Sequence, residues 1–477
     1  MSDVTLPARS ETQTQLPIQA VPAGNQTHAL DDLRRRVVGR VHTPTDPTWD
    51  AARTPWVVNI PQHPMAVLEV HDADDVVAAV RWAVDHGCQV TAQPTGHGGL
   101  ATLDQTLLLR TRALGGIEVD VQRRTVTIGS GVKAGELCAA LEGTGLTFLC
   151  GSNSDPSVTG MTITGGISWF GRAYGLGADS IVSVELVDGL GRVRRLSATE
   201  DTELFWAVRG GGGDFGIITK LEVALHPCAE VYGGRFLWPL EQMDDVLRTF
   251  RRATGVAPEE LTTWFHVYQF PPLPEVPEPI RGKAFASVAV AFIGSREEAE
   301  PHLAAYRAIP GMAMDLVGEV PLSRLSSIAE EPTDPMPGMQ RSALLNELDD
   351  DAIAALVASV GPGSGSPLTI VQIRHFGGAF AADREGRGVH GPVTEPYNLF
   401  ALGVPAVPEL VAPIEMFFGR LSASVAHVAS GRTLLNFLEH DEDPGKWWTP
   451  ATRERLAAAK QVSDPLHTIR SNRPVRP

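Results

Sequence analysis

The apolar and polar positions of the first half of the chain predict strands and helices in alternation. Residues 66–70 form an apolar run typical of a strand, and residues 73–86 carry valines at helical spacing. Gly87 follows at the position where helices commonly end. Residues 89–92 then form a second strand, so residues 66–92 predict a strand–helix–strand unit. It ends in the sequence PTGHGG at residues 94–99.

The same patterns extend to about residue 227, where a first domain is expected to close. Residues 151–177 are rich in Gly, Ser and Thr, but regularly placed apolar residues argue against a flexible linker there. Asp188-Gly189 predicts a hairpin. The other expected strands are 107–109, 117–120, 125–129, 181–187, 191–196 and 217–225, and the other expected helices are 30–36, 134–141 and 204–209.

The second half has a different pattern, in which longer strands are separated by helices. This is typical of an α+β domain with helices on one face of an antiparallel sheet. A Pro-rich segment at 271–279 is expected to be a rigid surface excursion. Expected strands are 232–238, 262–270, 284–292, 369–376, 397–404 and 433–438, and expected helices are 296–306 and 452–460.

Composition excludes several classes of protein. The 477 residues include 40 Lys and Arg against 56 Asp and Glu, a formal charge of −16, which disfavours nucleic acid as a partner. Four cysteines are too few for a disulfide framework. There is no apolar run of the length that a membrane helix needs and no signal-peptide pattern in the polar leader. We therefore expect a cytoplasmic protein without a membrane partner.

Two glycine-rich segments carry the chemistry, whereas a third does not. Residues 211–216 (GGGDFG) match G-x-G-x-x-G, but a helix precedes them and a strand follows, the reverse of a nicotinamide-binding site. Residues 94–99 and 151–166 offer backbone N–H groups that could hold a pyrophosphate. His97 lies among glycines, so a ligand could approach its ring; in isolation it would more often be a solvated turn residue.

In this order and spacing the motifs resemble the berberine-bridge-enzyme-like oxidases of the vanillyl-alcohol-oxidase superfamily, over residues 30 to 475. The resemblance implies an α+β, two-domain PCMH-type FAD-binding fold with an antiparallel-sheet substrate domain. Its domains would be a flexible leader (1–28), an FAD-binding domain (29–228), a substrate-binding domain (229–430) and a C-terminal segment returning to the FAD-binding domain (431–477). The motifs are residues 56–59, 94–99, 151–166, RAYGLGADS (172–180), LFWAVRGGGGDFGIIT (204–219), 435–437, Asp464-Pro465 and Ser471-Asn472.

The resemblance also implies which residues hold FAD. His97 matches the histidine that bonds to the 8α-methyl of the flavin, and Asn436 matches an asparagine of a C-terminal strand that faces the isoalloxazine. No metal site is expected. The other matched cofactor residues are Thr95, Gly96, Gly98 and Gly99 at the pyrophosphate, Asp155, Gly160, Thr164, Gly165 and Gly166 in the second flavin-binding stretch, and Gly177, Asp179, Ile217 and Ile218 near the adenine half.

The sequence departs from the family pattern at two positions. Many relatives bond the flavin a second time through a cysteine, but Asn153 stands at that position here, and Cys150 lies three residues away. We therefore expect a bond through His97 only. Relatives often place a tyrosine two residues before the asparagine, where this chain has Leu434. The catalytic base must then lie elsewhere.

The candidates for that base come from strands expected to cover the flavin. They are Tyr397, Tyr268 and His375, although each could equally be a half-buried sheet residue. Glu439 ranks below them, because in a strand it would point away from Asn436.

The expected function is that of an FAD-linked oxidase. A small-molecule substrate, either a natural product or a carbohydrate, would give a hydride to flavin N5, and O2 would accept the electrons. Two alternatives remain open: a flavin dehydrogenase with another acceptor, and a non-catalytic flavin- or ligand-binding relative that lacks a base. The sequence does not predict the oligomeric state.

Overall fold

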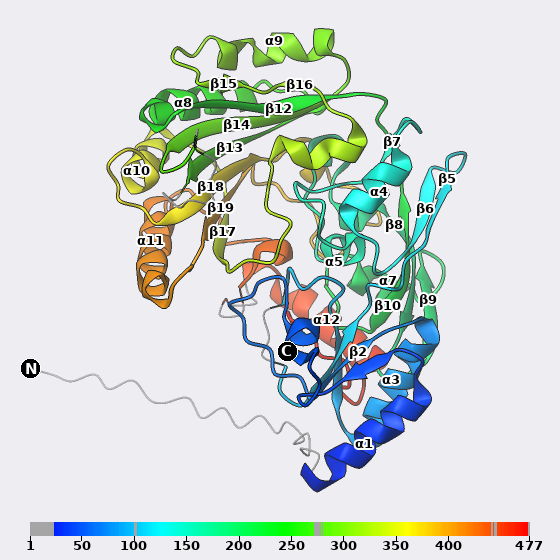
Figure 1. The fold of residues 1–477 in the computed structure, drawn as a ribbon. Helices are drawn as coiled ribbons and strands as arrows, with labels where there is room; N and C mark the ends of the chain where they lie inside the picture. Colours follow the sequence, from blue (N-terminus) through cyan, green and yellow to red (C-terminus); the bar gives the residue numbers. More distant parts are fainter. Residues whose placement is uncertain are drawn as a thin grey trace, which may run out of the picture.

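The computed structural model describes residues 23–99, 103–270, 278, 280–439, 442 and 446–475. Most of the predicted leader and nearly all of the Pro-rich segment at 271–279 lie outside these residues. Within the described part, Figure 1 shows two regions that meet along a broad face. The first half of the chain forms two small sheets, here called the N-terminal sheets, and a separate two-stranded pair, and the second half forms one large sheet.

The first N-terminal sheet contains the predicted strand–helix–strand unit. Its strands have the order β1-β2-β4-β3, with β2, β4 and β3 parallel and β1 antiparallel. The Asp72 side chain caps α3 by accepting from two backbone N–H groups, and Gly87 ends it at φ +65°. The elements are α1 (Ala23–Arg36), β1 (Arg40–His42), α2 (Trp49–Arg53), β2 (Ala66–Glu69), α3 (Ala73–His86), β3 (Gln89–Ala92) and β4 (Thr106–Arg110).

The second N-terminal sheet is antiparallel, with the order β5-β6-β10-β8-β9. The predicted hairpin is present, since β8 and β9 pair antiparallel. Asp188 Oδ1 stabilises its turn by accepting from the backbone N–H groups of Leu190 and Arg192. The elements are β5 (Ile117–Asp120), β6 (Thr125–Gly129), α4 (Ala134–Leu141), β7 (Leu146–Thr147), α5 (Val158–Ile163), α6 (Gly171–Tyr174), η1 (Gly177–Ser180), β8 (Ile181–Val187), β9 (Val193–Ser197), α7 (Thr202–Val208), β10 (Ile217–Ala224) and β11 (His226–Pro227).

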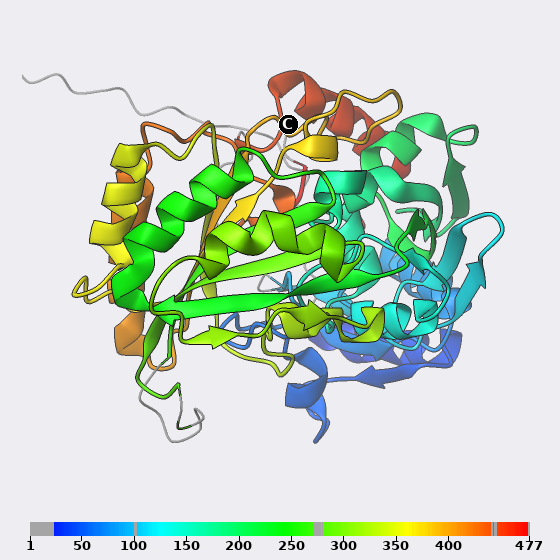
Figure 2. The ribbon, with the colours of Figure 1, turned by 90° about the horizontal axis from the view of Figure 1, so that it is seen from above.

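The large sheet has the order β15-β12-β14-β13-β18-β19-β17, with β16 pairing to β12. Helices α8, α9, α10 and α11 lie on its outer face, as Figures 1 and 2 show. The elements are β12 (Val231–Pro239), η2 (Leu240–Gln242), α8 (Met243–Thr254), β13 (Leu261–Gln269), β14 (Ala284–Ile293), α9 (Arg296–Arg307), β15 (Met314–Asp315), β16 (Gly318–Glu319), η3 (Leu322–Ile328), β17 (Met339–Leu345), α10 (Asp350–Val360), β18 (Leu368–His375), η4 (Gly378–Phe380), β19 (Tyr397–Gly403), η5 (Pro408–Leu410) and α11 (Val411–Ser424).

Two sequence predictions fail in this half. Strand β17 was not predicted, because its sequence MQRSALL has no clear alternation. The strand predicted at 433–438 is instead the short 3-10 turn η6 (Leu435–Phe437), which belongs to none of the sheets that the structure describes. Its leucines are apolar because they fill the core, not because they alternate across a sheet.

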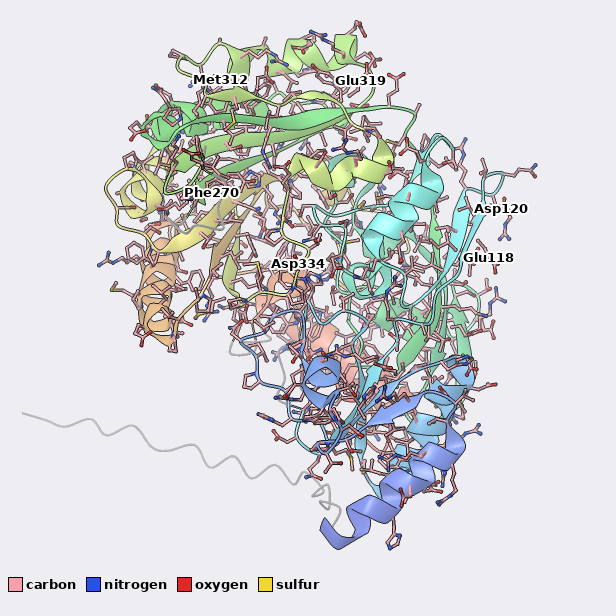
Figure 3. The ribbon with its side chains drawn as sticks, in the orientation of Figure 1. Glu118, Asp120, Phe270, Met312, Glu319 and Asp334 are labelled. Carbon is pink, nitrogen blue, oxygen red and sulfur yellow. The ribbon has the colours of Figure 1, made fainter. Side chains whose placement is uncertain are left out.

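The inner face of the large sheet packs on the N-terminal half. Trp264 of β13 stacks on Trp169 at 3.7 Å between ring centroids. The loop that follows η3 passes between the two regions, where Figure 3 labels Asp334. The chain then returns: α12 (Pro450–Ser463) packs on α7, and the following segment bonds to β3 through Val90 and Arg470. None of the described helices is long and apolar enough to cross a membrane.

Candidate functional site

A cavity of about 440 Å³ lies between the N-terminal half and the inner face of the large sheet. One wall consists of the loop 94–99, the segment around α5 and the start of β10. The opposite wall consists of side chains from β18 and β19. Among the predicted cofactor residues, those that line the cavity are Thr95, Gly96, His97, Gly98, Gly99, Gly160, Thr164, Ile217, Ile218 and Asn436.

His97 is held on two sides. Its ring stacks on Trp56 at 4.2 Å between centroids, and its Nε2 lies 2.9 Å from Asp155 Oδ2. The other oxygen of Asp155 pairs with Lys133. Burial raises the pKa of Asp155, but the hydrogen bonds from Lys133 and His97 outweigh it, and the pKa stays below its usual value. An ionised Asp155 must accept from Nε2–H, which leaves Nδ1 as the unprotonated nitrogen of the neutral ring.

Burial lowers the pKa of His97 despite the carboxylate of Asp155. The ring is therefore neutral at pH 7, as a nucleophilic nitrogen must be. Nδ1 has no hydrogen-bond partner among the residues that the structure describes. The arrangement suits a histidine that forms a bond through Nδ1 to a ligand in the cavity.

The glycines allow the backbone to approach a ligand closely. Gly96 has φ +88°, and a Cβ there would lie 2.9 Å from Pro55 Cα. A Cβ at Gly165, with φ +132°, would lie 2.6 Å from Asn436 Oδ1. Neither position accepts a side chain without moving the wall of the cavity.

Unpaired polar atoms show that this wall suits a polar ligand. The side chains of Gln93, Ser130 and Thr159 line the cavity, and each has a buried polar atom without a hydrogen-bond partner in the structure. Arg470 and Arg473 line the same region, and Arg473 Nη1 lies next to Gly98. A dinucleotide with a negatively charged diphosphate would use the unpaired donors, the two guanidinium groups and the backbone that the glycines leave accessible. The residues therefore fit FAD.

Asn436 lines the cavity, but on the turn η6 and not on a strand. Its Oδ1 accepts from the Gly166 N–H at 3.0 Å, and its Nδ2 donates to the Met161 carbonyl and the Thr164 hydroxyl. The amide therefore ties the C-terminal segment to the glycine-rich segment. Because strand alternation does not apply to a turn, the argument against Glu439 was wrong: it also lines the cavity.

Five of the predicted cofactor residues do not line the cavity: Asp155, which holds His97, and Gly165, Gly166, Gly177 and Asp179. Gly165 and Gly166 form the turn that Asn436 and Gly177 brace from behind. Asp179 accepts from the Gly388 N–H and lies within ion-pair distance of Arg209 and Arg387. The structure thus places Gly177 and Asp179 in contacts that support the cavity wall.

Two of the three candidate bases lie on the opposite face of the large sheet. The Tyr397 hydroxyl bonds to Thr254 Oγ1 at 2.7 Å, within the core under α8. His375 Nε2 accepts from Arg172 Nη1 at 2.9 Å. Burial and Arg172 lower the pKa of His375 to about 2, so this ring cannot take up a proton at neutral pH. Strand alternation explains both positions, since the cavity side chains of β18 and β19 have even numbers.

Tyr268 is on the inner face, where it pairs across the strands with Ile370 of the cavity wall, but Tyr268 itself does not line the cavity. Its ring stacks on His266 at 5.0 Å, and its hydroxyl is buried without a hydrogen-bond partner in the structure. Burial raises the pKa of Tyr268 well above its usual value. The hydroxyl is therefore protonated at neutral pH, and it can pass a proton along only by giving up its own.

Neither Cys150 nor Asn153, the two residues considered for a second bond to the flavin, places a free nucleophile in the cavity. Cys150 is buried, its Sγ lies 3.4 Å from Cys138 Sγ, and it is outside the cavity lining. Asn153 lines the cavity; its Nδ2 donates to the Pro332 carbonyl and its Oδ1 accepts from the Asp155 N–H. Asn153 thus holds the loop that carries Asp155.

Sequence reasoning missed the side chains of the sheet wall. Arg374 and Gln372 of β18, Phe400 of β19 and Phe437 of η6 line the cavity, as does Glu331 of the loop after η3. A signal was available, because Gln372 and Arg374 are polar residues at alternate positions of a strand whose neighbouring positions Val371 and Ile373 are apolar. The side of the strand that faces the cavity could not be read from it.

Comparison with known proteins agrees with this geometry. Residues 64–197 match the FAD binding domain family. The (R)-6-hydroxynicotine oxidase of Paenarthrobacter nicotinovorans is 34% identical over 192 residues, which are 40% of this chain and 42% of that protein. The chain thus spans less than half the length of this curated relative.

Solved structures cover nearly the whole chain at lower identity. BBE-like 1 of Physcomitrella patens has a TM-score of 0.82 and 17% identity, over 94% of this chain and 99% of that one. Phl p 4, a grass pollen allergen with glucose dehydrogenase activity, has a TM-score of 0.79 and 18% identity, over 94% and 99%.

Fold and site together define a flavoprotein: residues 64–197 form an FAD binding domain whose glycine-rich loops line a cavity suited to FAD. More particularly, the chain has the fold of BBE-like 1 of Physcomitrella patens, a two-domain FAD-binding fold with an antiparallel-sheet domain, as the resemblance of its motifs predicted.

Proposed function

We propose that the protein is an FAD-linked oxidase that takes a hydride from an alcohol or related C–H of a natural-product or carbohydrate substrate, with O2 as the electron acceptor. The observation that carries this proposal is His97, with a neutral ring whose Nδ1 is free in the same cavity as the glycine-rich loops. FAD supplies the redox chemistry when bound, and the protein supplies position and electrostatics.

The residues of the chain divide this work. The loop 94–99, with Arg470 and Arg473, holds the diphosphate side, and Asn436 keeps the segment around Thr164 in place. The inner face of the large sheet closes the cavity over the substrate and limits the access of water. Tyr268, the one former base candidate on this face, is proposed as the proton relay.

We further propose that FAD is bonded through His97 only. Asp155 orients the ring, and Lys133 keeps Asp155 ionised. Acid precipitation of the purified protein should leave yellow colour in the pellet, and His97→Ala should release all of it to the supernatant. Cys150→Ala is the matched control, and its pellet should stay as yellow as that of the unchanged protein.

Three other results of the acid precipitation would each contradict part of the proposal. Colour that remains in the His97→Ala pellet would contradict the assignment of the bond. Colour lost from the Cys150→Ala pellet would contradict single attachment. Protein that stays colourless after FAD is supplied would contradict the flavoenzyme proposal as a whole.

A dehydrogenase that uses another acceptor is the second candidate. The observation in its favour is that Phl p 4, which shares this fold, is described as having glucose dehydrogenase activity. The yield of hydrogen peroxide per substrate oxidised distinguishes the two: close to one for an oxidase, and near zero for a dehydrogenase tested with an artificial electron acceptor.

A further inference from the structure

Arg374 is a buried cation on the wall of the cavity. It lies near the end of β18, its side chain faces the cavity, and only 6% of the residue is exposed. Burial lowers the pKa of Arg374 to about 10, so the guanidinium remains charged at neutral pH. A buried charge is costly unless it is paired.

The protein gives Arg374 neutral partners. Nε and Nη2 both donate to Gln372 Oε1, at 2.9 and 2.7 Å. Three aromatic rings surround the guanidinium, with centroids 4.2 Å (Trp264), 4.8 Å (Phe437) and 5.4 Å (Phe400) from Cζ. No carboxylate among the described residues lies within ion-pair distance of it; Glu331, which lines the same cavity, raises the pKa of Arg374 through its charge but forms no ion pair with it.

Two hydrogen-bond donors are left over at this place. Nη1 of Arg374 has no partner among the residues that the structure describes. Because arginine only donates, the oxygen of the Gln372 amide must face it, and the NH2 group of Gln372 must point elsewhere. That NH2 group also bonds to none of the described residues. Both side chains line the cavity, so their unused N–H groups can serve one ligand there.

The cavity wall next to these donors is apolar. Ile370 of β18, Leu402 and Phe400 of β19, and Phe437 of η6 also line the cavity. A ligand that fits has an anionic group with two acceptor oxygens at one end and an apolar body at the other. The diphosphate of FAD would have other partners, since Arg473 lies beside Gly98 and Arg470 also lines the cavity.

We propose that Arg374 and Gln372 form the binding site for a substrate carboxylate, and that the substrate is a carboxylic acid with an apolar, aromatic body. This inference rests on the proposed function and narrows its substrate class. The second N–H group explains why a carboxylate fits better than a single oxyanion: two N–H donors from neighbouring side chains can each serve one of its two oxygens.

The test uses benzoate and its uncharged counterpart benzamide as probes, titrated into the yellow holoprotein and followed by the change in flavin absorbance. We expect benzoate to bind at least about 10-fold more tightly than benzamide, because charge-assisted hydrogen bonds favour the anion. Arg374→Met should weaken benzoate binding by about 30-fold or more and change benzamide binding by less than about 3-fold. Arg374→Lys should retain part of the preference.

Arg420→Met is the matched control, because Arg420 is also an arginine over an aromatic ring, that of Phe417, but is exposed on α11. It removes the same charge and should leave both probes unaffected. Equal binding of benzoate and benzamide by the unchanged protein would overturn the proposal even if Arg374→Met does not fold. So would equal weakening of both probes accompanied by a shift in the flavin reduction potential, since Arg374 would then serve the flavin.

Failure of the proposed function gives a different result. Protein that remains colourless with added FAD would contradict that function, and calorimetric titration with benzoate would still test the carboxylate site. Heat of binding that is lost in Arg374→Met and retained in Arg420→Met would support the site without the flavin chemistry. Absence of benzoate binding in the unchanged protein would overturn it.

Discussion

The two walls of the cavity achieve binding by different means. The N-terminal wall uses backbone: glycines at positions where a Cβ would collide, and side chains such as Asn436 that are fully occupied in holding loops together. The sheet wall uses side chains that alternate along strands, with Arg374 and Gln372 keeping unused donors. The first wall suits a constant ligand such as the cofactor, and the second can change its specificity by single substitutions without disturbing the fold.

The largest effect is expected where the backbone wall is altered. Gly165→Ala places a Cβ 2.6 Å from Asn436 Oδ1 at φ +132°, so both strain and collision oppose the native loop. In a His97→Ala background, where FAD is not bonded, we expect the FAD dissociation constant to rise by about 100-fold, from about 3 kcal/mol of strain and displacement. Fluorescence quenching on FAD binding measures it.

Gly143→Ala is the control for this substitution. Gly143 also has a positive φ, +75°, but no heavy atom lies within 4 Å of its added Cβ. It should lower the free energy of unfolding by about 1 kcal/mol and leave FAD binding unchanged. Equal effects of the two alanines on FAD binding would show that the wall does not depend on close backbone approach.

A second prediction compares the two faces of the large sheet. Tyr268→Phe removes the hydroxyl on the inner face, and turnover should fall by about 10- to 100-fold if it relays the substrate proton. Tyr397→Phe, on the outer face, should leave turnover unchanged. It should lower the free energy of unfolding by about 1 kcal/mol, because Thr254 loses its partner. A larger loss of turnover from Tyr397→Phe would contradict the assignment of faces.

The smallest expected effect is a loss of unfolding free energy at acid pH that is caused by His266 on the inner face of the large sheet. Burial lowers the pKa of His266 to about 3, below the usual value of about 6.5 in an unfolded chain. As the pH falls below 6.5, the unfolded state takes up a proton that the folded state does not, so stability decreases by about 1.4 kcal/mol per pH unit. Between pH 6.5 and 5, His266 should account for about 2 kcal/mol of lost stability.

Urea unfolding at several pH values measures this loss. His266→Gln should show a shallower dependence of unfolding free energy on pH than the unchanged protein. The slopes should differ by nearly one proton taken up on unfolding. His97→Gln is the comparison from the other wall, and it should change the slope less, because Asp155 partly offsets the burial of His97. Identical slopes for all three proteins would contradict a neutral, buried His266.

The sequence by itself determined most strands of the N-terminal half, and its motifs pointed to the loop 94–99, which lines the cavity. The bounds of the helix at 73–86 agree with the prediction, because the valine spacing and Gly87 both point to them, and the structure adds the Asp72 cap. The loop 94–99 could be singled out because it stands in a fixed order and spacing with the other motifs of the chain, whereas His97 in isolation would be read as a solvated turn residue. Such signals are local, so they survive without knowledge of the tertiary fold.

The tertiary structure alone decided which side chains face the cavity. Tyr397 and His375 were reasonable candidates from their strands, but a shift of one residue along a strand moves a side chain to the other face. The segment at 433–438 looked like a strand because core packing and strand burial give similar apolar runs. Arg374 gained its environment from Trp264, Phe400 and Phe437, which lie on three different elements. Contacts between residues far apart in sequence depend on strand register and packing, and local sequence patterns determine neither of them.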